Sequence, residues 1–384
     1  MRDHAGAGRL REVALLFLTL GVTAFGGPAA HVAMMRQQVV EKRKWLDEQQ
    51  FLDLLGASNL IPGPTSTELA IYLGYTRAGP VGLLLAGALF ILPAMLLVLA
   101  FAWAYVQFGS TPQAGALLYG IKPVILAVIV QAIYGLLRTA VKTWLLAAVV
   151  VLTIALFFLG VNPLVPLFGL AIAVTLVENR SLLYGRVHTG ALLLPFAQVT
   201  PPSGQAFTLG ALFLTFLKIG ATLYGSGYVL LAFLHDDFVS RLGWLTDRQL
   251  LDAVAVGQFT PGPVFTTATF IGYLLGGLPG AVVATVAIFL PSFFFVAIVY
   301  PFVPRLRASP WTSRFLDGAN AAAVGLMAAV AWQLATSSII DVATALLALV
   351  AAIVLIRFRV NSAWLVLAGG AIGLAAHALG APTL

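Results

Sequence analysis

Two proline–glycine–proline breaks interrupt this chain, and hydroxyl side chains follow each of them. Residues Pro62–Pro64 precede Thr65–Thr67, and residues Pro261–Pro263 precede Thr266 and Thr267. A helix that restarts inside a membrane after such a break presents unpaired N–H groups and the positive end of its dipole. This arrangement binds an anion without any charged side chain.

The two breaks are therefore expected to hold a small oxyanion from opposite sides. Glycine lets the backbone approach a ligand closely, and proline fits the first turn of a helix because its missing N–H costs nothing there. The alternative is that each break is only a structural kink, which two matched copies with donors after each make less attractive. The expected binding residues at the breaks are Gly63, Pro64, Thr65, Ser66, Thr67, Gly262, Pro263, Thr266 and Thr267.

Small residues also interrupt the first apolar segment of each half of the chain. They either bring backbone to the anion or allow tight helix packing, and the sequence leaves both interpretations open. Ser226 stands where the other half has Gly27, which adds a potential donor. These candidates are Gly26, Gly27, Gly225, Ser226 and Gly227.

Three ionisable residues within apolar segments are further candidates, because charge inside a membrane usually serves function. Lys122 either adds positive charge to the anion site or reaches toward the membrane interface. Glu68 follows the first hydroxyl run and is a candidate proton carrier; the alternative is a salt bridge to Lys122 or Arg36. His31 is a second candidate for proton coupling, or only a hydrogen-bond partner.

Several other kinds of chemistry lack the residues that they need. The chain has no cysteine, no nucleotide-binding loop and no histidine–glutamate helix motif. No Ser/His or paired-carboxylate constellation indicates hydrolysis inside the membrane. We therefore expect a protein that is not an enzyme and that uses neither a metal nor a cofactor.

Composition places all of these residues in a membrane. The 384 residues are 60% hydrophobic and 9% charged, with a mean hydropathy of +0.99, whereas soluble proteins carry about 25% charged residues. The apolar runs are long and do not alternate, which predicts an all-α polytopic protein in the lipid bilayer. The net charge of +7 does not indicate nucleic-acid binding, because the basic residues lie mostly in short loops between apolar runs.

The chain repeats itself at an offset of 199 positions, which becomes 198 after the breaks. Trp45-Leu46 matches Trp244-Leu245, and Gly74-Tyr75 matches Gly272-Tyr273. We therefore divide the chain into an N-terminal membrane repeat at 1–180, a linker at 181–205 and a C-terminal membrane repeat at 206–384.

Each half is expected to contain one helix, one broken segment and four further apolar runs. The helices are expected at 13–35 and 206–233, and the broken segments at 47–75 and 246–273. Each arm of a broken segment is shorter than the roughly 20 residues that a membrane crossing needs. This predicts about ten crossing helices plus two re-entrant helical hairpins.

An odd number of crossings in each half would make the halves inverted-topology repeats. Assigning sides in this way puts 14 Lys and Arg on one face and five on the other, and the first face is then cytoplasmic. The same assignment puts the termini outside, although the N-terminus is basic.

The two halves resemble the chromate transporter (CHR) family in its long, two-domain form. The resemblance covers nearly the whole chain. Its residues are Phe25-Gly26-Gly27-Pro28, His31, Met35-Arg36, Trp45-Leu46, Pro62-Gly63-Pro64, Gly74-Tyr75, Tyr224-Gly225-Ser226-Gly227-Tyr228, Trp244-Leu245, Gly257–Pro263 and Phe270–Tyr273.

The resemblance implies an inner-membrane carrier that exports chromate, a tetrahedral dianion, and so confers chromate resistance. Combined with the breaks, it leads us to expect a secondary active exporter whose partners are chromate or a related oxyanion, in the cell inner membrane, as a possible homodimer. The alternative is a transporter or channel-like pathway for sulfate or another small inorganic anion.

Overall fold

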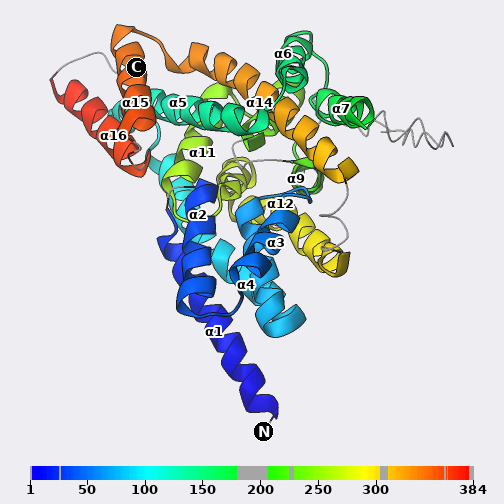
Figure 1. Ribbon diagram of the computed structural model, residues 1–384. Helices are drawn as coiled ribbons and strands as arrows, with labels where there is room; N and C mark the ends of the chain where they lie inside the picture. The colour runs from blue at the N-terminus through cyan, green and yellow to red at the C-terminus, as the bar shows by residue number, and fades with distance from the viewer. Residues whose placement is uncertain are drawn as a thin grey trace.

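The structure is a computed structural model that describes residues 2–25, 27–179, 206–224, 229–302, 310–358, 360 and 362–379. Within these ranges it consists of helices and their connections, with no strand. The helices form two layers, which Figure 1 shows as a lower part containing α1 to α4 and an upper part containing α5 and α14. This confirms the all-α fold.

The first layer, which we call the hairpin layer, contains the early elements of both halves. They are α1 (Arg2–Thr23), α2 (Gly27–Arg36), η1 (Gln37–Lys42), α3 (Glu48–Ser58), α4 (Thr65–Phe108), α9 (Leu209–Thr222), α10 (Leu230–Leu234), η4 (His235–Arg241), α11 (Asp247–Phe259), η5 (Val264–Thr266), α12 (Thr267–Val299) and η6 (Tyr300–Phe302).

The second layer, which we call the bundle layer, contains the late elements. They are α5 (Pro112–Ala140), α6 (Trp144–Phe158), η2 (Val165–Leu170), α7 (Ala171–Glu178), α14 (Pro310–Ser338), α15 (Val342–Phe358) and α16 (Ser362–Ala378). Helix α5 packs on α15 and α16 of the other half, and α14 packs on α6 and α7 in return. The two repeats therefore interlock and do not form separate bodies.

Equivalent signals in the two halves start and bend equivalent helices. Asp47 and Thr246, which match in the repeat, each cap a helix through a capping box that satisfies two N–H groups at once. Helices α4 and α12 each contain a sharp kink at a glycine in the left-handed region, Gly79 (φ 65°) and Gly277 (φ 60°). Glycine tolerates this conformation and the proline after each kink favours a new helix start.

Each kink divides a long helix into a short arm and a long arm. Helix α3, the first break and the arm from Thr65 to Ala78 form the first hairpin. Helix α11, the second break, η5 and the arm from Thr267 to Gly276 form the second hairpin. These are the two broken segments that the sequence predicts.

The two hairpins enter the hairpin layer from opposite ends. The base of the first hairpin lies at the end of α12, where the Tyr75 and Tyr300 rings are 4.4 Å apart. The base of the second hairpin lies at the end of α4, where Leu274 and Arg248 share a cavity with Tyr105. We call the first of these the basic end and the second the opposite end.

The first helix of each half differs from the expectation of a single segment over 13–35 or 206–233. Helix α1 ends at Thr23 and α2 begins at Gly27. Both outer ends of this pair lie at the basic end, because Glu12 pairs with Arg77 at 2.6 Å and Arg36 pairs with Glu48 at 2.8 Å. The α1–α2 pair therefore folds back on itself instead of crossing.

The second half repeats this correction. Phe207, just before α9, packs on Trp244 at the base of the second hairpin, with ring centroids 5.3 Å apart. The first helix of each half is therefore divided into two shorter helices, and the odd-number argument, which counted it as a single crossing, gains no support from these helices. The inverted relation of the two halves is instead supported by the two hairpins, which enter the hairpin layer from opposite ends.

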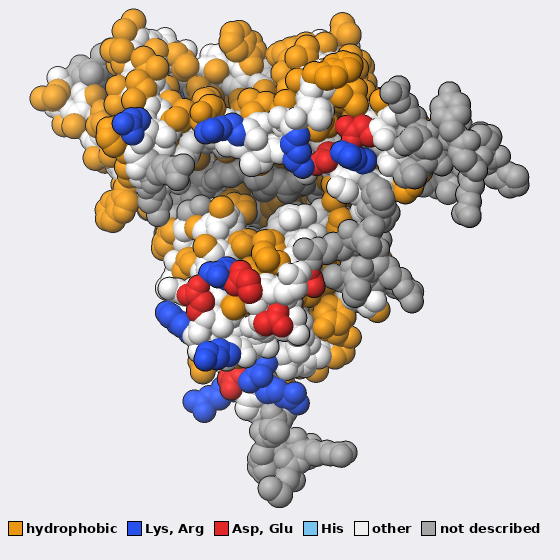
Figure 2. Space-filling view, viewed as in Figure 1, with side chains coloured by type: hydrophobic (Ala, Val, Ile, Leu, Met, Phe, Trp, Pro, Cys, Tyr) orange, Lys and Arg blue, Asp and Glu red, His pale blue; other side chains and the backbone are white. Residues whose placement is uncertain are grey.

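Membrane-spanning helices are evident from length and composition. Within the described ranges, four helices are long and apolar enough to cross a bilayer: Thr65–Phe108, Pro112–Ala140, Val264–Val299 and Trp311–Thr336. Shorter apolar helices accompany them in both layers. Hydrophobic side chains cover much of the surface in Figure 2, while Lys, Arg, Asp and Glu gather around α1 and the first hairpin at the bottom of that view and in a second row across its upper part. The protein is a multi-pass membrane protein.

Candidate anion site

Backbone breaks from both halves meet at the centre of the hairpin layer. The Gly63 N–H donates to the Leu223 carbonyl at 2.8 Å, and the Gly262 N–H donates to the Ala24 carbonyl at 2.9 Å. Gly63 and Gly262 occupy equivalent positions of the repeat, and so do Ala24 and Leu223. Each hairpin tip is therefore bonded to the interrupted first helix of the other half, as expected for two units related by a two-fold axis.

His31 reinforces one of these junctions. Its Nε2 lies 3.0 Å from the Ala24 carbonyl, which requires that this nitrogen carry the proton and donate it. The ring is buried and packs edge-on against Phe90. His31 thus ties α2 to the interrupted segment that also receives Gly262.

A cavity of about 620 Å³ reaches the first break from the basic end, between the two layers. The start of α2 lines it with Pro28 and Ala29, and the first hairpin lines it with Asn59 and Thr65. The bundle layer adds Thr139, Lys142, Asp317 and Asn320. The cavity therefore brings two helix starts and several polar side chains to one space.

The N-terminus of α4 is open toward this cavity. No side chain caps it, and among the described residues the N–H groups of Thr65 and Ser66 have no backbone acceptor. The next two N–H groups, of Thr67 and Glu68, donate to the Pro64 carbonyl. A helix start with free N–H groups attracts an anion through hydrogen bonds and the helix dipole.

The equivalent space beside the second break is almost closed. It measures about 10 Å³ and is lined by Leu231, Val254, Gln258 and Val264 among others. In the repeat, these four residues match Val32, Leu55, Asn59 and Thr65, all of which line the large cavity. The two halves thus hold equivalent sites in different states, one open and one closed.

The predicted hydroxyl donors divide in the same way. Thr65 lines the open cavity, whereas Ser66 and Thr67 are buried beside it in the hairpin arm. In the second half, the Thr266 hydroxyl donates to the Pro263 carbonyl and the Thr267 hydroxyl to the Val264 carbonyl, both at 2.8 Å. These two threonines therefore bond their own backbone in this state.

Glu68 lies directly behind the first break. It is fully buried, and the Ser292 hydroxyl of α12 donates to its Oε1 at 3.4 Å. A Cβ atom on Gly63 would overlap this carboxyl group. Neither cation that the sequence offered as a partner is available, since Lys122 pairs with Asp252 and Arg36 with Glu41 and Glu48.

Lys122 lies at the opposite end, away from the open cavity. Its Nζ is 3.1 Å from Asp252 Oδ1 of the second hairpin, and both side chains are buried. The Tyr105 hydroxyl donates to Asp252 Oδ2 at 2.8 Å. This ion pair fastens α11 to α5.

The equivalent positions at the basic end are not joined in this way. Asn320, the counterpart of Lys122, lines the open cavity, and Asp53, the counterpart of Asp252, accepts a hydrogen bond from Gln49 at 2.9 Å. A buried ion pair therefore joins α5 to α11 at the opposite end, whereas Asn320, the counterpart of Lys122, lines a cavity between the layers at the basic end.

Sequence reasoning missed the contribution of the bundle layer to the cavity. Asn320 was visible as the polar counterpart of Lys122, and Thr139 and Lys142 as polar residues after an apolar run. Ser292 carried no signal, because nothing in the sequence relates α12 to Glu68. Predicted Gly27 begins α2, whereas Gly26, Gly225, Ser226 and Gly227 lie outside the described residues.

The described part of the chain contains no group of three or more His, Cys, Asp or Glu residues that could hold a metal ion.

The family model for chromate transporters matches the chain in two parts, residues 11–176 and 210–374. The offset between the two parts is that of the internal repeat. The chain belongs to the chromate transporter family. Both matched parts include a hairpin with its break, so the family pattern contains the centre described above.

Full-length relatives agree with this assignment. The chain is 37% identical to a chromate transport protein of Cupriavidus metallidurans, over 96% of this chain and 94% of the relative. It is 35% identical to a probable chromate transport protein of Synechococcus elongatus, over 90% and 89%. It is 34% identical to a chromate transport protein of Pseudomonas aeruginosa, over 83% and 79%. No solved structure matches the chain.

Proposed function

We propose that this protein is a secondary active transporter that exports chromate across the inner membrane and so confers resistance to it. The family membership and the names of the relatives support chromate as the substrate. The observation that carries the transport mechanism is the difference between the equivalent spaces of about 620 Å³ and 10 Å³ at the two breaks.

The open cavity suits a small oxyanion. The N–H groups of Thr65 and Ser66 donate hydrogen bonds to the anion, and the positive end of the dipole of the α4 arm attracts its charge. Asn59 and Asn320 supply side-chain amide donors around it. Lys142, paired with Asp317 at 2.7 Å and more than half exposed, lies where the anion enters.

The charge distribution favours a cytoplasmic basic end. Because Glu12 pairs with Arg77, the N-terminal arginines that the sequence put on the other face belong to the basic end. That leaves Arg241 and Arg248 of the sequence-based assignment on the opposite face and removes the conflict with a basic N-terminus. By the positive-inside rule the cavity opens to the cytoplasm, where an exporter takes up its substrate.

Inverted repeats give such a protein a simple way to change sides. In the alternate state, the space beside the second break is open and the space beside the first break is closed. The Lys122–Asp252 pair is then separated and the opposite end is open. The closed space beside the second break argues against a channel-like pathway, which needs both breaks to be accessible at once.

Proton coupling belongs to Glu68 in this scheme. A buried carboxyl group without a cation is favoured in its protonated form, and Glu68 contacts both the first break and α12 of the other half. The protonation of Glu68 therefore depends on the packing around it, and this packing changes when the two halves exchange their open and closed forms. His31 already donates to Ala24, which leaves it a positioning role.

Transport of chromate into everted membrane vesicles tests the proposal. Asn320→Leu keeps the size of the side chain but removes a donor from the cavity, and we expect uptake to fall at least tenfold. Gln258→Leu removes an amide at the closed site. It is the matched control, because it reports any general effect of losing an amide near a break. Unchanged uptake with both Asn320→Leu and Thr65→Val would remove the cavity as the binding site.

A further inference from the structure

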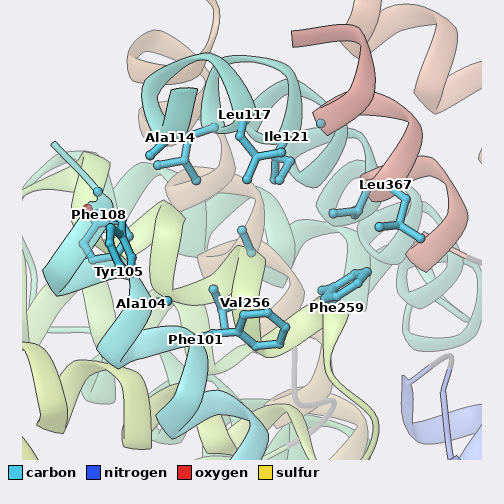
Figure 3. A pocket seen from close by; sticks show the side chains of 15 residues that line it. Phe101, Ala104, Tyr105, Phe108, Ala114, Leu117, Ile121, Val256, Phe259 and Leu367 are labelled. Carbon is cyan, nitrogen blue, oxygen red and sulfur yellow. The ribbon is translucent and has the colours of Figure 1, made fainter. Parts of the chain in front are cut away.

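A second, apolar cavity of about 400 Å³ lies between the layers at the opposite end. Figure 3 shows Phe101, Tyr105 and Phe108 of α4 facing Ala114 and Leu117 of α5 across it. Helices α11 and α16 close the remaining sides, with residues such as Phe259 and Leu367. Tyr105 supplies the only side-chain hydroxyl in its lining.

A polar cavity of about 710 Å³ continues from it toward the surface. The two share Tyr105, Gly109 and Leu118. The polar cavity adds Ser110, Thr111, Asp252 and Arg248.

Arg248 gives this polar cavity a positive charge. Its side chain is exposed, in the first turn of α11, and it forms no salt bridge within the described part of the chain. Asp252 is already held by Lys122 and Tyr105. The charge of Arg248 is therefore available to an anionic ligand.

Polarity changes along one direction through the joined cavities. Arg248 and Thr111 mark the ends of helices at the surface, whereas Phe101 and Phe259 lie deeper along α4 and α11. A phospholipid has the same order, with its phosphate at the surface and its acyl chains toward the middle of the membrane. Two of the helices that line the apolar cavity, α4 and α5, are themselves long and apolar enough to span a bilayer.

We propose that the joined cavities bind an anionic phospholipid, with the phosphate at Arg248 and one acyl chain between α4, α5, α11 and α16. Helix α11 lines both cavities and carries Asp252 of the buried ion pair. A bound lipid therefore holds the second hairpin against α5 and stabilises the closed form of the opposite end.

Native mass spectrometry of the purified, delipidated protein tests this site. Phosphatidylglycerol and phosphatidylcholine of the same chain length are added separately. We expect the wild type to bind phosphatidylglycerol at least tenfold more tightly, Arg248→Gln to lose that preference, and Arg248→Lys to keep it. Arg314→Gln, a basic residue at the other end, is the matched control and retains the preference.

The acyl chain is tested separately from the headgroup. Ala104→Phe and Ala114→Phe fill the apolar cavity without touching Arg248. Each is therefore expected to weaken the binding of both lipids by about the same factor. A preference that survives Arg248→Gln overturns the proposal. Full competition of inorganic phosphate with phosphatidylglycerol also overturns it, because a free anion then occupies the site. So does a dimer that Ala114→Phe converts to monomers, because a second copy of the chain then occupies the site.

Discussion

Removing the charge of Asp252 is the most direct test of the alternating mechanism. In the observed state this carboxylate is the buried partner of Lys122, and it also accepts a hydrogen bond from Tyr105. Asp252→Asn keeps the size and the hydrogen-bond acceptor but leaves Lys122 as a buried charge without its counter-ion. In the alternate state the pair is already separated, so the substitution costs little there.

The size of the effect follows from the burial of the pair. The exposed fractions of the two side chains are 9% for Lys122 and 1% for Asp252. Removing one partner of a buried pair costs about 3–5 kcal/mol. Since each 1.36 kcal/mol is a factor of ten, even about 3 kcal/mol shifts the ratio of the two states by roughly 100-fold toward opening of the opposite end.

Cysteine accessibility measures that ratio directly, because the natural chain contains no cysteine. A cysteine replacing Asn320 reports the basic-end cavity, and one replacing Val264 reports the closed site. With Asp252→Asn, a charged maleimide is expected to label the first site more slowly and the second much faster. Asp317→Asn is the control, because its partner Lys142 is 59% exposed and a surface pair contributes little.

The double variant Lys122→Met/Asp252→Leu separates the ion pair from simple damage. Replacing both partners of a buried pair by apolar residues is often neutral or stabilising, so this variant is expected to return toward the wild-type labelling pattern. Unchanged labelling at both cysteines in Asp252→Asn would refute the closing role of the pair. Faster labelling at both would indicate loosening of the whole fold and would refute it equally.

Three further substitutions test separate parts of the structure. Glu68→Gln is expected to abolish the dependence of chromate uptake on a pH gradient while chromate still protects a cysteine that replaces Ala132, in the lining of the same cavity, from labelling; gradient-driven uptake that persists contradicts the coupling role. Gly63→Ala is expected to lower stability by about 2 kcal/mol or more, because φ is 138° and the new methyl group would overlap Glu68, whereas Gly210→Ala, with open space around it, is expected to be harmless in the same thermal unfolding assay. Burial and the charge of Asp237 raise the pKa of Asp236 to about 6 from 3.8, so the folded protein holds this proton more tightly than the unfolded chain and gains stability as the pH falls from 6 to 4. Asp236→Asn is accordingly expected to be about 3 kcal/mol more stable at pH 7 and to lose most of that advantage by pH 4, and a constant advantage across this range would contradict the reasoning.

Local features of the fold were predictable because each rests on neighbouring residues. The Asp47 and Thr246 capping boxes, the Gly79 and Gly277 kinks and the two proline breaks all follow from residue types within a few positions. The fold-back of α1 on α2 was not predictable. Both helices pack on α4, which lies far along the chain, and Glu12 of α1 meets Arg77 there.

The residues of the candidate site also divide into those that neighbouring residues predict and those that they do not. Thr65 and the helix start behind it were found because a break and its donors are adjacent in sequence. Asn320 and Ser292 were not found, since they reach the first hairpin from the other half. The sequence left Lys122 either near the anion or reaching toward the membrane interface, whereas packing of α5 on α11 pairs it with Asp252.

The sequence by itself determined that this protein is a doubled, apolar helical chain with two equivalent breaks, because composition, period and glycine–proline chemistry are local or repetitive properties. It also carried the family resemblance, which the matches at 11–176 and 210–374 confirm. Only the tertiary structure decided that the two breaks are unequal, with about 620 Å³ beside one and 10 Å³ beside the other. The physical reason is that similar local sequences can pack in two ways, and the contacts between layers that accompany each packing, such as Lys122 with Asp252, are not encoded in a local pattern.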